Sequence, residues 1–280
     1  MPYESAEHVQ TPEGVQYHVG TGPGDLAEII LMCGDPARAR RVAEHFDEIE
    51  VTRENREYVT LTGPYRGERL SVVATGIGCD NMEIAVIELA KCLPRAGATF
   101  IRLGSCGALQ PGIHIGDLVI STGAVRLENT STYFVEPGYP AVASPDVTLA
   151  ILEAARRGGV RHFLGLTACA PGFYGAQGRD VGLPLRDPDL PKRLGAQGVL
   201  NFEMETSALF TLGGLVKART GAACVVFADR TQNQFVDHEA KKAAEDSVIR
   251  LGLDAVEVLR AMDRARGDNL HWCPSDGLKE

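Results

Sequence analysis

Short apolar runs that alternate with segments of helical period are the feature that most constrains this chain. Six runs of strand length are rich in Val, Ile, Leu and Phe; they span residues 29–33, 70–74, 99–103, 117–121, 163–167 and 222–227. Helical patterns cover residues 36–46, 82–93 and 147–157, and a final helix carries an apolar stripe at Val248, Leu251, Ala255, Leu259 and Met262. Strands that alternate with helices predict an α/β fold with a parallel or mixed central sheet.

Length and composition predict one globular domain. A chain of 280 residues can bury a sizeable core, and neither an internal repeat nor a linker divides it. We therefore expect a single domain over residues 1–280, with its core at about 17–265. A loose C-terminal tail is expected at about 266–280, and it contains the only tryptophan, Trp272.

Charge and cysteine usage exclude several classes of partner. The chain has 28 Lys and Arg against 37 Asp and Glu, and its net charge of −9 argues against binding nucleic acid or an anionic membrane. No apolar run approaches the ~20 residues of a membrane span, and the first residues lack the pattern of a signal peptide. The seven cysteines are scattered without Cys-x-x-Cys spacing, which predicts free thiols in a reducing cytoplasm and no metal site.

Two glycine-containing segments, each with an arginine, point to an anion site. Gly34 follows the first strand and precedes a helix that Asp35 can cap, and Arg38 lies in the first turn of that helix. Arg102 lies in an apolar run and needs an anionic partner, and we expect Gly104-Ser105-Cys106-Gly107 to form a turn after it. Because ligands gather at the carboxyl ends of strands in α/β sheets, these segments predict a phosphate pocket. A helix cap, and an ion pair between Arg102 and a nearby carboxylate, are the purely structural alternatives.

Two other segments supply groups that suit a nucleoside. Phe173, Gln177 and Arg179 offer an aromatic face, an amide and a guanidinium on one loop, which fits a planar heterocycle with carbonyl and N–H edges. Glu203 and Glu205 follow, and a carboxylate that accepts from two adjacent hydroxyls fits a ribose diol. Carboxylates at a helix N-terminus are also favourable for the helix dipole alone.

The order and spacing of these motifs resemble the nucleoside phosphorylase superfamily of the hexameric bacterial type, and within it the uridine phosphorylases. The resemblance covers about residues 18–259 and implies a single-domain, three-layer α/β/α fold with a mixed central sheet. The motifs that carry it are Tyr17-His18, Gly34-Asp-Pro-x-Arg38, Arg56-Glu57, Thr75-Gly-Ile-Gly78, Arg102-x-Gly-Ser105-x-Gly107, Gly116-Asp117, Phe173, Gln177-Gly-Arg179, Glu203-Met-Glu205 and Arg230-Thr-Gln232.

The resemblance implies a role for each matching residue. Phosphate would be held by Gly34, Arg38, Arg102, Ser105 and, from a neighbouring subunit, Arg56. Ribose would be held by Met204, Glu205 and, again from the neighbour, His18. The base would be held by Phe173, Gln177, Arg179 and Glu203, with Arg230 supporting their loop.

The activity that the resemblance implies is reversible phosphorolysis of uridine to uracil and ribose 1-phosphate, the work of a pentosyltransferase. Inorganic phosphate is then a co-substrate, and neither a cofactor nor a metal is expected. Because two site residues would come from a neighbour, the resemblance implies a homo-oligomer with shared active sites, either a dimer or a trimer of dimers.

Three departures from the family pattern bear on specificity and assembly. Ser105 stands where many relatives have Thr, which keeps the hydroxyl. Cys79-Asp80-Asn81 stands where many have Gly-Pro-Ser near a monovalent cation site, which leaves that site and the hexamer open. Asp229 precedes Arg230 close to the point where purine-specific relatives place an Asp that protonates the base, so Asp229 is an alternative catalytic acid. The runner-up function is therefore a purine or broad-specificity nucleoside phosphorylase.

Three further classes are weaker. A nucleosidase that uses water is disfavoured by the arginines of the predicted phosphate pocket, and a non-catalytic nucleoside-binding protein is disfavoured by the intact set of site residues. A nicotinamide dehydrogenase would need a third glycine after Gly76-Ile-Gly78, where Asn81 stands instead.

Overall fold

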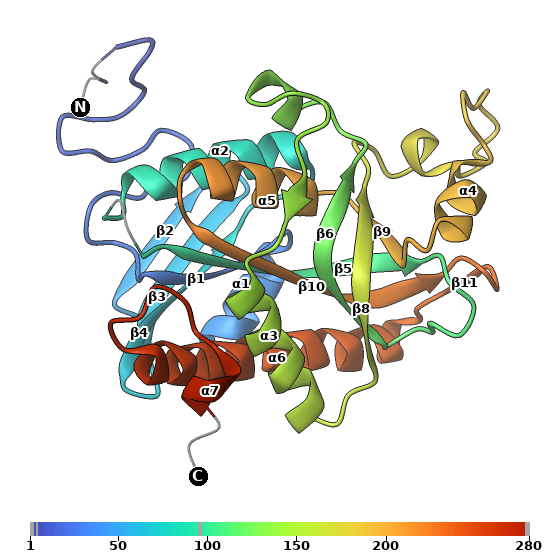
Figure 1. Ribbon diagram of the computed structural model, residues 1–280. Helices are drawn as coiled ribbons and strands as arrows, with labels where there is room; N and C mark the ends of the chain where they lie inside the picture. The colour runs from blue at the N-terminus through green and yellow to red at the C-terminus, as the bar shows by residue number, and fades with distance from the viewer. Residues whose placement is uncertain (1–2, 4, 95–96, 278–280) are drawn as a thin grey trace.

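One mixed sheet organises the molecule (Figure 1), whose computed structural model describes residues 3, 5–94 and 97–277. The strand order is β11-β10-β6-β8-β9-β5-β1-β4-β3-β2, with β7 beside β6 and a further pairing between β10 and β5. The strands are β1 (Ile29–Cys33), β2 (Val51–Asn55), β3 (Tyr58–Tyr65), β4 (Glu68–Ala74), β5 (Thr99–Ala108), β6 (Leu118–Arg126), β7 (Ala141–Val142), β8 (His162–Cys169), β9 (Asn201–Glu203), β10 (Arg219–Asp229) and β11 (Gln234–Phe235).

The pairing of β10 with both β5 and β6 closes five strands into a ring. The ring runs from β5 to β10, β6, β8 and β9 and back to β5, and the remaining strands β1, β4, β3 and β2 extend from it as an open sheet. Parallel pairs such as β1–β5 and antiparallel pairs such as β3–β4 occur side by side. The predicted mixed sheet is confirmed.

Helices cover both faces of the sheet, and Figure 1 shows α2 and α5 together on one side and α3 and α6 on the other. The reason is visible in β1, where Leu31 and Cys33 point into one apolar cluster and Ile30 and Met32 into another. A strand that is buried on both sides needs a helical layer on each. The helices are α1 (Pro36–Ala43), α2 (Cys79–Lys91), α3 (Pro145–Arg157), α4 (Leu190–Ala196), α5 (Thr206–Leu215), α6 (His238–Arg266) and α7 (Pro274–Gly277), with short 3₁₀ turns at Ser131–Tyr133 and Gly175–Gln177.

The expected turn at Gly104-Ser105-Cys106-Gly107 is wrong, because β5 continues through it to Ala108. Gly104 and Ser105 pair in parallel with β10, and Gly107 pairs with Phe202 of β9. Glycine is required at position 104, since a Cβ there would lie 2.7 Å from the sulfur of Cys224. The predicted phosphate residues Arg102 and Ser105 thus lie on one continuous strand.

The hairpin of β2 and β3 has no counterpart among the predicted strands, although it is an integral part of the sheet. In the segment predicted as a C-terminal tail, Trp272 packs against the apolar cluster beneath α6 and residues 274–277 form α7, while residues 278–280 lie outside the described ranges. Within the described ranges, the helices lack the combination of length and apolar composition that crossing a membrane would require.

Candidate active site

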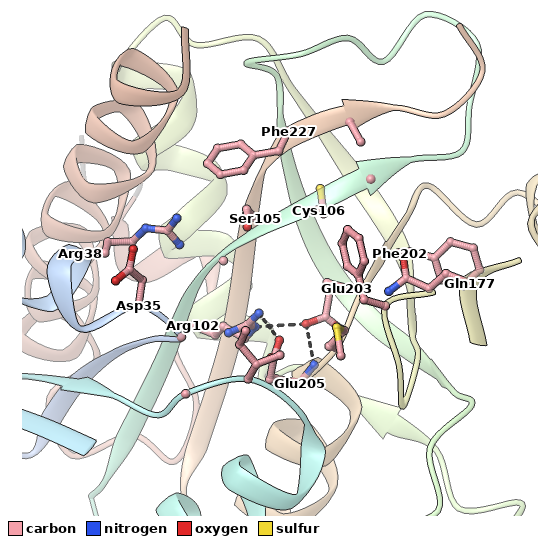
Figure 2. Close-up of a pocket in the computed structure, with 18 of the residues that line it drawn as sticks. Asp35, Arg38, Arg102, Ser105, Cys106, Gln177, Phe202, Glu203, Glu205 and Phe227 are labelled. Carbon is pink, nitrogen blue, oxygen red and sulfur yellow. Dashed lines mark hydrogen bonds and ion pairs between the residues drawn. The ribbon is translucent and has the colours of Figure 1, made fainter. Parts of the chain in front are cut away.

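A cavity of about 710 Å³ opens where β1, β4 and β5 reach their carboxyl ends (Figure 2). This is the edge at which parallel strands of an α/β sheet present ligand-binding groups. Ten of the residues predicted for the site line this one cavity; they are Gly34, Arg38, Arg102, Ser105, Phe173, Gln177, Arg179, Glu203, Met204 and Glu205.

The turn from β1 into α1 builds the side of the cavity that is predicted to hold phosphate. Asp35 caps the helix by accepting from the amide of Ala37 at 2.8 Å. Gly34 packs so closely on the neighbouring loop that a Cβ would lie 2.9 Å from the carbonyl oxygen of Gly76. Arg38 follows in the first turn and is buried, and its Nη1 donates to the carbonyl of Leu103 on β5 at 3.1 Å. This bond ties the helix to the strand that carries Arg102 and Ser105.

Two guanidinium groups in this cavity keep donors without acceptors. Arg38 Nε and Arg102 Nη1 are buried and have no hydrogen-bond partner among the residues that the structure describes. A buried N–H without an acceptor is costly, and because these two donors belong to residues that line a cavity, a ligand atom there can accept from them. Two arginine donors converging on one cavity fit a tetrahedral oxyanion such as phosphate.

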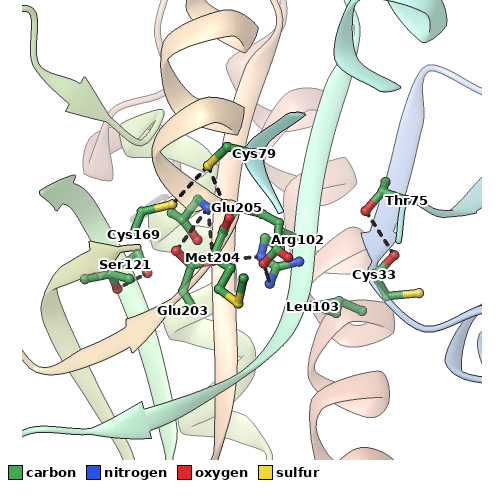
Figure 3. A network of polar contacts seen from close by, with 12 residues as sticks. Cys33, Thr75, Cys79, Arg102, Leu103, Ser121, Cys169, Glu203, Met204 and Glu205 are labelled. Atoms are coloured by element: carbon green, nitrogen blue, oxygen red, sulfur yellow. Dashed lines mark hydrogen bonds and ion pairs between the residues drawn. The ribbon is translucent and has the colours of Figure 1, made fainter. Parts of the chain in front are cut away.

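Arg102 is also the centre of a buried carboxylate network (Figure 3). Its Nε donates to Glu203 Oε2 at 3.1 Å, and its Nη2 makes a short contact with Glu205 Oε2. The other oxygen of Glu205 accepts from the amide of Gly78 at 2.7 Å. Burial raises the pKa of Glu205 against the attraction of Arg102, and the charge of Glu203 adds to the rise. Gly78 has a φ of +102°, so the loop needs glycine to present its amide to Glu205.

Glu203 lines the cavity, as its predicted role in base binding requires, and it also has contacts that we did not predict. Its carboxylate accepts from Arg102 and from the amides of Glu205 and Thr206 at 2.9–3.1 Å. It therefore caps the N-terminus of α5 and orients Arg102, and only 1% of its side chain is exposed. Its neighbour Met204 lines the cavity, and the Met204 carbonyl oxygen accepts from the thiol of Cys79 at 3.1 Å.

The loop around the second 3₁₀ turn forms the side of the cavity that is predicted to hold the base. Arg179 Nη1 donates to the amide oxygen of Gln177 and to the carbonyl of Phe173, and its guanidinium carbon lies 3.8 Å from the centre of the Phe173 ring. Arg230 stands behind the loop and donates to the Gln177 carbonyl at 2.7 Å. Burial, and after it the charge of Arg230, lowers the pKa of Arg179 to about 10, so the group remains a cation at neutral pH.

Aromatic side chains that we did not predict complete the wall. Phe202, Phe227 and Phe235 line the cavity together with Ala228. Phe202 lies beside Glu203 on β9, whose three buried residues show no alternating pattern that could have indicated it. Phe227 lies in a run that is apolar throughout, and no local signal distinguishes it from core residues.

His18 and Arg56 do not line the cavity of their own chain. His18 Nδ1 lies 2.6 Å from Glu88 Oε1, and Arg56 Nη2 donates to the Tyr17 hydroxyl at 3.2 Å. Arg56 sits in the tight turn between β2 and β3 with a φ of +54°. These two predicted site residues thus form a neighbouring surface group with Tyr17.

Asp229 does not face the cavity either. Its Oδ1 accepts from the amides of Thr231 and Gln232 and from the Thr231 hydroxyl, and its Oδ2 lies 3.1 Å from His114 Nδ1. Although burial opposes them, these hydrogen bonds lower the pKa of Asp229. An ionised carboxylate whose hydrogen bonds hold the turn after β10 is poorly suited to act as an acid. The residue at this end of β10 that lines the cavity is Ala228.

The described part of the chain holds no group of three or more His, Cys, Asp or Glu side chains that could ligate a metal ion. All seven cysteines are free thiols, six of them buried. The Cys79 and Cys169 sulfurs lie 3.4 Å apart behind Met204 (Figure 3).

Comparison with known proteins identifies the family of this chain. Residues 28–258 match the model of the phosphorylase superfamily. The chain belongs to this superfamily. The match spans every residue of the cavity and of the carboxylate network.

Individual members of the superfamily are also similar over most of the chain. The uridine phosphorylase of Thermococcus kodakarensis is 44% identical over 97% of both chains. The uridine phosphorylase of Escherichia coli is 34% identical over 87% of this chain and 97% of its own. The guanosine phosphorylase of Halorubrum lacusprofundi is also 34% identical, over 87% of this chain and 99% of its own.

Proposed function

We propose that this phosphorylase catalyses the phosphate-dependent, reversible cleavage of the N-glycosidic bond of uridine to uracil and ribose 1-phosphate, with 2′-deoxyuridine as a second candidate substrate. One observation carries the proposal. The unpaired donors of Arg38 and Arg102 share a single cavity with the amide and guanidinium of Gln177 and Arg179. The uridine phosphorylases among the similar proteins support the same choice of substrate.

The sugar end of the reaction follows from the charges of the cavity. As the glycosidic bond breaks, positive charge develops on the ribose. Phosphate held by Arg38, Arg102 and Ser105 can stabilise that charge and attack the anomeric carbon. Glu205 accepts from the ribose hydroxyls and is itself fixed by Arg102, so both substrates are aligned through one guanidinium.

The base end must stabilise negative charge. The departing uracil becomes an anion spread over N3, O2 and O4, and donors at those edges lower the barrier. Because Arg179 holds the amide oxygen of Gln177, the amide nitrogen is left to donate to a uracil carbonyl. Displacement by phosphate and departure of the uracil anion need neither an organic cofactor nor a bound metal, and phosphate is a co-substrate.

We also propose that the enzyme works as a homo-oligomer, either a dimer or a trimer of dimers, in the cytoplasm, where it would serve pyrimidine salvage. The placement of His18 and Arg56 outside their own cavity supports sites shared between subunits. The seven free thiols support a reducing compartment.

A purine or broad-specificity activity is the second candidate, and the similarity to a guanosine phosphorylase favours it. The contacts of Asp229 weigh against it as a purine acid in this chain. If purines are cleaved, base recognition must use the amide and aromatic groups that line the cavity.

A substrate panel tests the proposal. Release of base from uridine, thymidine, inosine and adenosine is measured with and without phosphate. We expect phosphate-dependent release of uracil, and a loss of at least about a hundredfold in kcat/KM for uridine in Arg179→Ala, because a donor to the leaving anion is removed. Cleavage of purines alone would replace the proposal by its alternative, and release without phosphate would indicate a nucleosidase.

A further inference from the structure

A carboxylate from the far end of the chain holds the predicted phosphate arginine. Glu245 lies on α6 and lines the cavity, although 207 residues separate it from Arg38. Its Oε1 accepts from Arg38 Nη2 at 3.2 Å, and its Oε2 accepts from Arg41 Nη1 at 2.6 Å. Only 12% of the Glu245 side chain is exposed.

These contacts fix the orientation of the Arg38 guanidinium. Nη1 is held by the carbonyl of Leu103, Nη2 is held by Glu245, and Nε alone has no partner among the described residues. In Figure 2 the Arg38 side chain extends from α1 toward Ser105. A planar group that is held at two corners presents its third donor in one direction only, which is what recognition of a single oxyanion requires.

Glu245 does not cancel the positive charge on this side of the cavity. It lies among Arg38, Arg41 and Lys241, whose Nζ is 4.0 Å from Glu245 Oε1. The next residue, Asp246, contacts Arg41 from the exposed side. When Asp246 is counted, three cations stand against two carboxylates, so this group keeps one net positive charge.

We propose that Glu245 is a positioning residue for the phosphate co-substrate, acting through Arg38. The proposal rests on the proposed function, since it takes phosphate as the ligand of Arg38. Without the carboxylate, Nη2 loses its acceptor, and the guanidinium is free to rotate away from the phosphate oxygens. Phosphate binding should then weaken while nucleoside binding, which uses other side chains, is preserved.

Three variants test this positioning role. Glu245→Ala removes the acceptor, Glu245→Gln keeps an acceptor oxygen at the same reach, and Asp246→Ala removes a contact of Arg41 but none of Arg38. We expect Glu245→Ala to raise the KM for phosphate at least about tenfold with the KM for uridine nearly unchanged. Glu245→Gln should restore most of the phosphate affinity, and Asp246→Ala should match the wild type.

A decrease in the KM for phosphate in the Glu245 variants would overturn the proposal. If Glu245 only competes with phosphate for Arg38, both Glu245 variants lower the KM for phosphate. If Glu245 only stabilises the fold, both KM values and the melting temperature change together. Should Glu245→Ala fail to fold, Glu245→Asn, whose amide is too short to reach Arg38, takes its place.

Calorimetric binding of inorganic phosphate without nucleoside separates this inference from the proposed function. Phosphate binding by the wild type that weakens in Glu245→Ala supports the positioning role even if uridine is not cleaved. Uridine cleavage with unchanged phosphate affinity in Glu245→Ala would refute the positioning role and leave the proposed function intact.

Discussion

At the scale of single residues, the Arg102 guanidinium has two kinds of contact. It offers an unpaired donor to the cavity and at the same time binds Glu203 and Glu205. Two buried carboxylates around one guanidinium leave a net negative charge, and burial makes that charge costly. This is why the pKa of Glu205 lies above its ordinary range although a cation touches it.

On acidification, the affinity for uridine should therefore begin to fall at a higher pH than it would if Glu205 had the pKa of an ordinary glutamate. The ionised form of Glu205 accepts the ribose hydroxyls, and it is lost as the pH falls through the raised pKa, above the usual value of about 4.3. The measurement is the dissociation constant of uridine against pH without phosphate, so that phosphate ionisation does not interfere. Glu205→Gln should bind uridine about ten to a hundred times more weakly and lack this dependence. If the dissociation constant of uridine for the wild type stays constant until the pH reaches about 4.3, the prediction is wrong.

Residues with a local sequence signal could be predicted, and those held by distant contacts could not. Arg38 and Gln177 were recognisable because a turn and a loop motif surround each of them, and both line the cavity. Glu245 lies in a helix whose sequence shows only its apolar stripe, and its contact with Arg38 exists only after folding. The contacts of Glu203 with Arg102 and with the α5 N-terminus could not be predicted, because they depend on the folded geometry of that N-terminus, and its contact with the base stays a prediction.

At the scale of elements, α5 connects the carboxylate network to the core. Glu205 stands at its N-terminus, and its middle is buried against β10. Two adjacent glycines near its C-terminal end differ sharply in their surroundings. A Cβ on Gly213 would lie 2.3 Å from Thr220 Cγ2, whereas a Cβ on Gly214 would meet nothing within 4 Å.

Alanine at these two positions should change stability in opposite directions. Gly213→Ala forces α5 away from β10 and should lower the free energy of unfolding by about 1–3 kcal/mol. Gly214→Ala is exposed and should raise it by up to about 1 kcal/mol through helix propensity. Denaturant unfolding of both variants checks this pair, and equal effects would show that the packing of α5 on β10 is not tight.

The boundaries of an element can be predicted where local sequence determines them. They cannot be predicted where pairing with a distant strand determines them. The strand at residues 29–33 matches β1 because its apolar run is bounded by Gly34. The extension of β5 to Ala108 through two glycines is set by its partners β10 and β9, which lie far along the chain. The β2–β3 hairpin could not be predicted from an apolar run, because β2 contains polar residues such as Thr52 and Arg53.

At the scale of the whole molecule, two of the proposed substrate-binding residues, His18 and Arg56, lie outside the cavity of their own chain. Arg56 contacts Tyr17, and the ring of His18 packs edge-on against the Tyr17 ring at 4.7 Å. Glu88 anchors His18 through Nδ1 and accepts from the amides of His18 and Val19. A rigid, partly exposed group of this kind can be offered to a second copy, and a two-fold interface would exchange it in both directions.

Mixing two inactive variants tests whether the site is shared. Arg56→Ala removes the donated residue and Glu205→Gln removes a residue of the receiving cavity, so each variant alone should have little activity. In a mixed dimer one site receives both defects and the other receives none. Random pairing after co-expression should therefore restore about a quarter of the wild-type activity. Activity that stays at the level of the separate variants, or an Arg56→Ala variant that is fully active alone, would show that each subunit works with its own residues only.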